Sequence, residues 1–142
     1  MQKFAVDIVR YNKAFFPNIL ALYTDAGWTN YTQNPDMLEK AYQNSLCILC
    51  ARCDGTIAGV VRAVGDGFSI VYIQDLLVHS AYRRHGIGGV LLETVLSEYP
   101  DVYQTILLTD KTDLLVRFYK NHGFLPVETC GCISFCRLRP PR

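Results

Sequence analysis

The sequence predicts an α+β protein with one mixed β-sheet, in a single domain that covers residues 1–142. Half of the residues are hydrophobic and 19% are charged, which is enough apolar material for a buried core. Two Asp-Gly pairs, at 54–55 and 66–67, separate three apolar runs and predict an antiparallel meander of three strands. After the meander, helical and strand-like patterns alternate, which is typical of a parallel strand pair.

One strand and two helices are expected before the meander. Apolar residues alternate loosely over 3–11, as in a strand. Pro17 suits the first turn of a helix, and Gly27 marks the end of its apolar repeat. The run Asn-Pro-Asp at 34–36 provides an N-cap, a proline at the first helical position and an acid in the first turn. A second helix therefore begins there.

The remaining elements complete the order β-α-α-β-β-β-α-β-α-β-β. They are strands at 46–52, 56–64 and 68–78, a helix at 86–99, a strand at 102–109, a helix at 113–122 ended by Gly123, and strands at 124–127 and 131–138. This order predicts a sheet that is antiparallel at first and has a parallel pair after the long helix.

Charge and hydropathy exclude several classes of protein. The net charge of +1 gives no broad basic surface for nucleic acid or for an anionic membrane. Charged residues interrupt the first apolar stretch, and no apolar run is long enough to cross a bilayer. We therefore expect a cytoplasmic protein with neither a membrane nor a nucleic-acid partner.

The six cysteines form two groups of three. They are Cys47, Cys50 and Cys53, and then Cys130, Cys132 and Cys136. Reduced thiols are expected in the cytoplasm. The spacing of the first group invites comparison with a metal site, but residues three apart on a strand point to opposite faces. The prediction is that all six are small buried hydrophobic residues and that no metal is bound, with a thiol-based metal or redox protein as an alternative.

A glycine-rich turn follows the strand that ends at residue 78. Gly86, Gly88 and Gly89 open the next helix, and Arg83 and Arg84 precede them. Glycines let a backbone approach a ligand closely, and a helix start offers unpaired N–H groups to an anion such as a pyrophosphate. Neither a dinucleotide fingerprint nor a Walker loop is present, because the third glycine of the one and the Gly-Lys-Ser/Thr of the other are missing. A turn without a ligand remains open on these residues alone.

Two motifs resemble those of the GNAT-type N-acetyltransferase superfamily. The run Arg-Arg-His-Gly-Ile-Gly at 83–88 matches its Q/R-x-x-G-x-G/A signature, and Phe-Tyr-Lys-Asn-His-Gly-Phe at 118–124 is similar to its F/L-Y-x-x-x-G-F motif. The resemblance extends from about 47 to 127 and is closest to small, single-domain, bacterial-like members. It implies a fold in which the fourth and fifth strands splay apart. It also implies transfer of an acetyl group from acetyl-CoA to a primary amine of a small molecule or peptide.

The resemblance also implies a binding surface for acetyl-CoA. Backbone N–H groups of the glycine turn would hold the pyrophosphate, with fixed positive charge from Arg83, and the turn comprises Arg84, His85, Gly86, Ile87, Gly88 and Gly89. Leu77 and Val78 would pair with pantetheine through their backbone, as an added strand does. Asp113 stands where many relatives carry an asparagine that contacts the cofactor.

The same resemblance assigns provisional chemical roles. Tyr119 corresponds to the general acid that protonates the departing thiolate. Gln74 is an amide where related small-amine enzymes often carry an acid, so Asp75 is the nearest carboxylate for a base, and Asp110 is a weaker candidate. The expected substrate pocket comprises Trp28, Tyr31 and Gln74. The reaction requires no metal.

Two other functions stay open beside acetyl transfer. The missing acid at Gln74 is also what a non-catalytic acyl-CoA-binding or protein-interaction module would show, and the cysteines leave the thiol-based alternative. An edge strand near the C-terminus would allow a homodimer. The sequence does not identify the amine acceptor.

Overall fold

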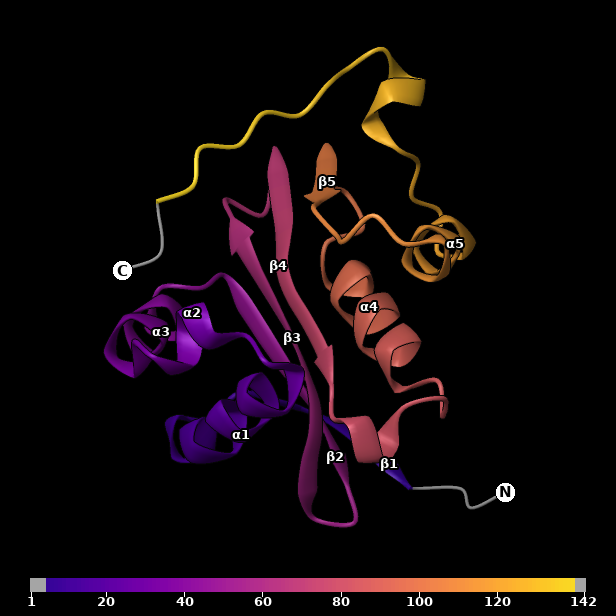
Figure 1. The fold of residues 1–142 in the computed structure, drawn as a ribbon. Helices are drawn as coiled ribbons and strands as arrows, with labels where there is room; N and C mark the ends of the chain where they lie inside the picture. Colours follow the sequence, from indigo (N-terminus) through magenta and orange to yellow (C-terminus); the bar gives the residue numbers. More distant parts are fainter. Residues whose placement is uncertain (1–4, 140–142) are drawn as a thin grey trace. The chain divides into compact units, whose positions relative to one another are not determined.

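The five strands lie side by side in one sheet, in the order in which they occur along the chain (Figure 1). A computed structural model describes residues 5–139 and divides the chain into two units, 1–108 and 109–142. The strands are β1 (Val6–Arg10), β2 (Cys47–Cys53), β3 (Thr56–Gly65), β4 (Ile70–Val78) and β5 (Gln104–Leu107). All neighbours are antiparallel except β4 and β5, which are parallel. The predicted mixed sheet is confirmed.

Four helices of the N-terminal unit cover the two faces of this sheet (Figure 1). Helices α1 (Phe16–Ala26), α2 (Thr29–Thr32) and α3 (Pro35–Gln43) lie on one face, and α4 (Ile87–Glu98) lies on the other. The predicted helix signals act as expected. Pro17 lies in the first turn of α1, Gly27 ends it at φ 72°, and the Asn34 side chain accepts a hydrogen bond from the Met37 N–H. The single turn of α2 was not predicted.

The core beneath α1 and α3 joins side chains from helices and sheet. It comprises Ile19, Leu22, Tyr23, Leu38, Tyr42, Ile48, Cys50, Ile57, Val60 and Leu77. Strands β2 and β3 are buried along almost their whole length, because helices cover both faces. Burial of an aliphatic side chain of this size contributes about 1.5–3 kcal/mol, so this layer holds the helices on the sheet.

The two predicted turns differ in form. Asp54 and Gly55 adopt φ of 49° and 82°, the left-handed pair that a two-residue hairpin requires. The second connection is longer, because residues 66–69 all lie outside the strands. There the Asp66 carboxylate accepts hydrogen bonds from the N–H groups of Phe68, Ser69 and Ile70. Strand β4 consequently starts at Ile70 rather than at residue 68.

A β-bulge in β4 changes which side chains face α1. Arg62 pairs with Asp75, but the next residue, Ala63, pairs with Ile73, so Gln74 has no partner on β3. An inserted residue shifts the alternation of faces by one position. As a result Asp75 and Leu77 share the α1 face of the sheet with Val60, although a regular strand would continue the face of Ile73.

The fourth and fifth strands splay apart, as the sequence analysis expected. Strand β5 pairs only with the first four residues of β4, from Ile70↔Gln104 to Ile73↔Leu107. Beyond Ile73, no described strand pairs with β4 on the β5 side, and Figure 1 shows β4 continuing alone. Among the described strands, residues 75–78 therefore have a neighbour on the β3 side only.

The C-terminal unit contains one α-helix, α5 (Asp113–Asn121), and a short 3-10 helix, η3 (Val127–Cys130). Thr112, rather than Asp113, caps α5 through a hydrogen bond from the Leu115 N–H. Gly123 follows the helix at φ 86°, and its N–H bonds to the Lys120 carbonyl, as expected for a C-terminal glycine.

The two strands predicted at 124–127 and 131–138 are wrong for the described residues. Residues 124–126 and 131–139 carry no helix or strand, and η3 begins at Val127, the last residue of the first predicted strand. The apolar side chains that suggested strands are largely exposed: Ile133 is 68% exposed and Phe135 is 90% exposed. Alternation alone did not make a strand, because neither side chain is buried against a partner.

The two groups of cysteines have opposite environments. The first group is buried, as predicted: Cys47, Cys50 and Cys53. The prediction is wrong for the second group, which is exposed: Cys130, Cys132 and Cys136. Burial raises the pKa of Cys50 to about 12, which keeps it a neutral thiol. Within residues 5–139, no cluster of three or more His, Cys, Asp or Glu side chains could hold a metal ion. None of the helices there has the length and hydropathy needed to cross a bilayer.

This difference predicts two classes of thiol reactivity. With a thiol reagent at pH 8, the three exposed cysteines should react within seconds to minutes, and the three buried ones only when the protein opens or is denatured. Mass spectrometry of the labelled peptides distinguishes the groups. Fast labelling of Cys50 in native protein would contradict the buried position of β2.

Candidate functional site

A strained turn links β4 to α4. After β4 the chain makes a short 3-10 helix, η2 (Ser80–Tyr82), and then enters left-handed conformations at Arg84, φ 67°, and Gly86, φ 78°. Left-handed backbone is unfavourable for a side chain such as that of Arg84, and strain of this kind concentrates at functional sites. A Cβ placed on Gly86 would meet no atom within 4 Å. Packing therefore does not explain the glycine, whereas its backbone angle does.

The start of α4 differs from the start of α3 in its cap. Gly86 is the N-cap residue and provides no side-chain hydrogen bond to the helix. The first N–H groups of the helix thus lack the side-chain acceptor that Asn34 gives to α3. Together with the positive end of the helix dipole, these N–H groups suit an anion such as a pyrophosphate.

Close packing of α4 against the sheet places this turn. A Cβ on Gly59 of β3 would lie 2.9 Å from the Leu77 carbonyl oxygen and 3.1 Å from Leu91 Cδ1 of α4. Gly59 pairs with Val78, the last residue of β4. The absence of a side chain at this point lets the N-terminal half of α4 lie directly on the end of β4.

The residues predicted to bind pantetheine lie in the part of β4 that extends beyond its pairing with β5. Leu77 pairs with Val60, and Val78 with Gly59, on the β3 side. The Leu77 side chain is buried in the core under α1, and its carbonyl oxygen lies on the β3 side, close to Gly59. The Val78 carbonyl accepts a hydrogen bond from Arg83 Nε at 3.3 Å, which brings this arginine back over the strand end.

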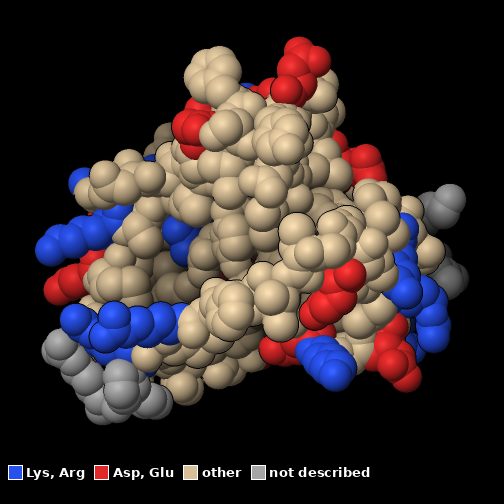
Figure 2. All heavy atoms as spheres, turned by 90° about the horizontal axis from the view of Figure 1, so that it is seen from above, with Lys and Arg blue, Asp and Glu red and all other residues tan. Residues whose placement is uncertain are grey.

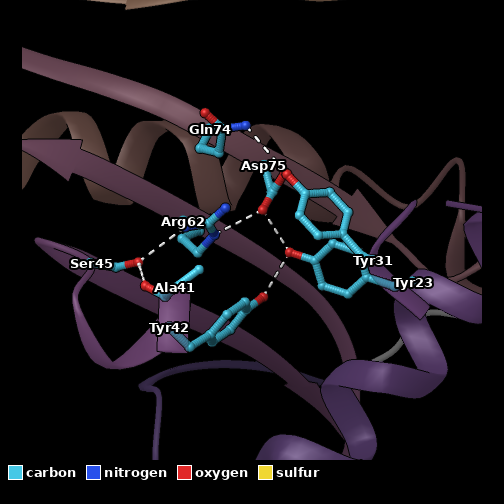
Figure 3. Close-up of polar contacts among 8 residues, drawn as sticks. All are labelled: Tyr23, Tyr31, Ala41, Tyr42, Ser45, Arg62, Gln74 and Asp75. Carbon is cyan, nitrogen blue, oxygen red and sulfur yellow. Dashed lines mark hydrogen bonds and ion pairs between the residues drawn. The ribbon is translucent and has the colours of Figure 1, made fainter. Parts of the chain in front are cut away.

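Asp75 lies at the centre of a buried polar network (Figure 3). Its Oδ2 accepts hydrogen bonds from Arg62 Nε at 2.8 Å and from the Tyr23 hydroxyl at 2.7 Å. The Tyr23 and Tyr42 hydroxyls are 2.9 Å apart, and Arg62 Nη1 donates to Ser45 Oγ. The side chains of Arg62 and Asp75 are 5% and 1% exposed. The residues of this network come from strands β3 and β4 and from helices α1 and α3.

Burial and charge perturb the groups of this network. Burial by itself lowers the pKa of Arg62, but the charge of Asp75 and its hydrogen bond raise this pKa by more. The pKa of Arg62 therefore lies above its ordinary value, and the guanidinium stays charged. Burial, followed by the charges of Tyr42 and Asp75, raises the pKa of Tyr23 far above its ordinary value. Tyr23 is therefore a neutral donor to the Asp75 carboxylate, whereas Tyr42, whose pKa burial also raises, contacts the Tyr23 hydroxyl.

The three residues predicted for the substrate pocket come together. Gln74 Nε2 donates to the Tyr31 hydroxyl at 3.3 Å, and the Trp28 and Tyr31 rings are 6.2 Å apart between centroids. Tyr23 packs edge-on against both rings. The bulge leaves Gln74 exposed next to the buried Asp75, and Figure 3 shows Gln74 directed toward Tyr31. These side chains form a neutral aromatic and amide surface beside β4.

Tyr119 and Asp113 belong to the C-terminal unit. Tyr119 is half-buried on α5, and its ring packs edge-on against Phe118 and Phe124. Burial raises its pKa, while a hydrogen bond with Thr109 lowers it by less, so the phenol carries its proton at neutral pH. Asp113 is exposed in the first turn of α5, where the positive end of the helix dipole stabilises a carboxylate.

Charged side chains are scattered among the described residues. Figure 2 shows both Lys and Arg and Asp and Glu side chains among a larger area of uncharged residues. This distribution agrees with the net charge of +1.

Sequence reasoning did not find Arg62, nor the network that joins Tyr23 and Tyr42 to Asp75. Their types gave a weak signal, because Arg62 interrupts an otherwise apolar strand and so required a buried partner. The partner could not be assigned, since the bulge that turns Asp75 to the same face is invisible in the pattern.

Comparisons with known proteins agree with this geometry. Residues 11–124 match the acetyltransferase (GNAT) family. A GNAT-family acetyltransferase from Streptococcus pneumoniae TIGR4 is 35% identical, with a TM-score of 0.86 over 96% of this chain and 100% of that one. A proposed acetyltransferase from Deinococcus radiodurans R1 is 27% identical, with a TM-score of 0.75 over 98% and 93%. An aminoglycoside N-acetyltransferase solved in complex with CoA shares the fold at 16% identity, with a TM-score of 0.65 over 99% and 96%.

The fold and the strand-turn-helix site therefore define an acyltransferase class of protein. Within it, the chain belongs to the acetyltransferase (GNAT) family.

The buried network makes a prediction about stability. Replacing Asp75 with alanine leaves the Arg62 charge buried without its partner and should cost about 3–5 kcal/mol of unfolding free energy. Asp7→Ala is the control, because it breaks an exposed ion pair with Arg52 and should cost about 1 kcal/mol or less. Urea denaturation at pH 7 measures both. Equal, small losses would mean that the network does not hold Arg62 in a dry environment.

Proposed function

We propose that the protein is an acetyl-CoA-dependent N-acetyltransferase that acetylates a primary amine by direct attack. The observation that carries the proposal is the end of β4: residues 74–78 lack a strand partner on the β5 side and run directly into the turn at Arg84 and Gly86. One edge suits an extended amide-containing chain, and the following helix start suits a pyrophosphate. Pantetheine and pyrophosphate follow each other in this order in CoA.

The residues present fit this group. Leu77 and Val78 would bind pantetheine through their backbone, and the N–H groups of residues 84–89 would hold the pyrophosphate. Arg83 adds positive charge at the same end of β4. Asp113 would contact the nucleotide end only as a hydrogen-bond acceptor. Acetyl-CoA supplies an acyl group activated as a thioester, and no metal takes part.

The acceptor would lie against Trp28, Tyr31 and Gln74. The amine nitrogen forms a bond with the carbonyl carbon, the carbon–sulfur bond breaks, and the amine loses one proton while the thiolate gains one. Tyr119 gives the proton to sulfur, which its raised pKa supports, since the phenol is protonated at neutral pH.

Asp75 is the proposed acceptor of the amine proton. Its carboxylate is buried and holds Arg62 and Tyr23, so a water must carry the proton to it. This engagement also supports a second candidate function, a non-catalytic acyl-CoA-binding module in which Asp75 is purely structural. Turnover distinguishes the two. The cytoplasmic location and the homodimer stay predictions.

Tyr119→Phe should lower kcat about 10²- to 10⁴-fold and leave the dissociation constant of acetyl-CoA unchanged, since only the proton donor is lost. The assay is CoA release with a panel of primary amines. Tyr103→Phe is the matched control, because it removes a phenol that is 85% exposed and should change nothing.

Three results would count against parts of this account. Acetyl-CoA binding without turnover on any amine would favour the binding module. Full activity of Tyr119→Phe would remove this residue as the acid. Absence of acetyl-CoA binding by the wild-type protein would reject the proposed function.

A further inference from the structure

An acid occupies an unfavourable position at the end of α1. Asp25 is the penultimate residue of this helix, and Gly27, two residues later, is the left-handed residue that ends it. A carboxylate in the last turn opposes the helix dipole and is unfavourable there. A residue that breaks a local rule in this way usually has a compensating partner elsewhere.

The partner of Asp25 is the segment that follows β4. Ser80 Oγ donates to Asp25 Oδ1 at 2.6 Å, and the Ser80 N–H donates to Oδ2 at 2.9 Å. His79 Nε2 lies 3.5 Å from Oδ1. The side-chain hydrogen bond of Ser80, and next its N–H, lower the pKa of Asp25, so the carboxylate is charged. Both carboxylate oxygens of Asp25 therefore accept hydrogen bonds from Ser80, which lies 55 residues later in the sequence.

His79 also makes contacts within this segment and with β3. His79 Nδ1 accepts a hydrogen bond from the Ala81 N–H, and the His79 N–H donates to the Ala58 carbonyl of β3. The Tyr82 N–H donates to the His79 carbonyl, and the His79 and Tyr82 rings pack edge-on. Residues 79–82 therefore form one unit between β4 and the turn at Arg84, and Asp25 fixes this unit to α1.

We infer that Asp25 is a positioning residue for acetyl-CoA: by clamping Ser80 and His79 to the end of α1, it holds the pyrophosphate-binding turn in its binding shape. The inference rests on the proposed function and extends it to a residue outside the turn. Asp25 need not touch the ligand. It acts through the backbone of residues 79–82, which leads directly into Arg83 and Arg84.

Helix α1 also carries Tyr23, which bonds to Asp75 two residues before Leu77. The same helix is therefore fixed at two points to the strand and turn that would bind the cofactor. The Tyr23 contact lies in the core, whereas the Asp25 carboxylate is partly exposed, so the second contact can be removed with less damage to the fold.

The test compares wild-type protein with Asp25→Asn, which keeps the shape but loses the charge. We expect the dissociation constant and the KM of acetyl-CoA to rise roughly tenfold, a usual size for coupling between sites, with kcat and the acceptor KM unchanged within about twofold. Ser80→Ala should give a smaller rise, since the backbone bond stays, and Ser80→Thr should restore it. Asp36→Asn, an exposed acid in the first turn of α3, is the control.

Hydrogen exchange of the ligand-free protein provides a readout that needs no cofactor. The Ser80 amide, which donates to Asp25, should exchange faster in Asp25→Asn than in wild type, while amides in β2 stay the same.

The outcomes separate the inference from the proposed function. Wild-type acetyl-CoA binding with an unchanged dissociation constant in Asp25→Asn would overturn the inference and leave the function standing. A purely structural role would reduce the active fraction without changing KM, and would also overturn it. Wild-type protein that binds no acetyl-CoA would reject the function, and unchanged Ser80 exchange would then reject the clamp independently.

Discussion

The ion pair between Arg62 and Asp75 constrains the rest of the N-terminal unit. Both side chains are almost fully buried, and a buried charge that loses its partner is strongly unfavourable. Their pairing requires the bulge at Gln74, because a regular strand would turn Asp75 to the α4 face. It also binds Tyr23 of α1 to the Asp75 carboxylate, and the Tyr23 hydroxyl in turn contacts the hydroxyl of Tyr42 on α3. The helices are thereby fixed in rotation as well as in distance, which hydrophobic packing alone does not specify.

The candidate site is a consequence of this arrangement. The bulge exposes Gln74 beside Tyr31, and the strand then continues for four residues without β5. Gly59 allows α4 to approach the end of β4, so the glycine turn lies where the free strand edge stops. Thus the candidate site combines a strand edge of β4, the start of α4 and the aromatic side chains of Trp28 and Tyr31. The first two are backbone features, which is why few of the expected site residues needed a particular side chain.

Much of the fold could be predicted from local signals, and the failures have local causes. Asn34, Pro17 and the 54–55 turn act within a few residues, so their effects are visible in sequence. The glycine turn and the Tyr119 segment were found through family motifs. The bulge could not be found, because β4 is apolar on both sides of it, and with it the Arg62 network stayed hidden. The prediction of two C-terminal strands was wrong because the alternation at Ile133 and Phe135 shows only hydropathy. It does not show whether another strand is available for pairing.

The most direct test of the account is whether the turn at Gly86 binds acetyl-CoA. Isothermal titration would compare wild type with Gly86→Ala and Gly55→Ala. Both glycines have positive φ, 78° and 82°, and both have open space around a Cβ, so the two variants should share a similar backbone strain. The account predicts that only Gly86→Ala weakens acetyl-CoA, by roughly tenfold or more, as expected when a close backbone approach is lost. Equal affinities for the two variants and the wild type would contradict it.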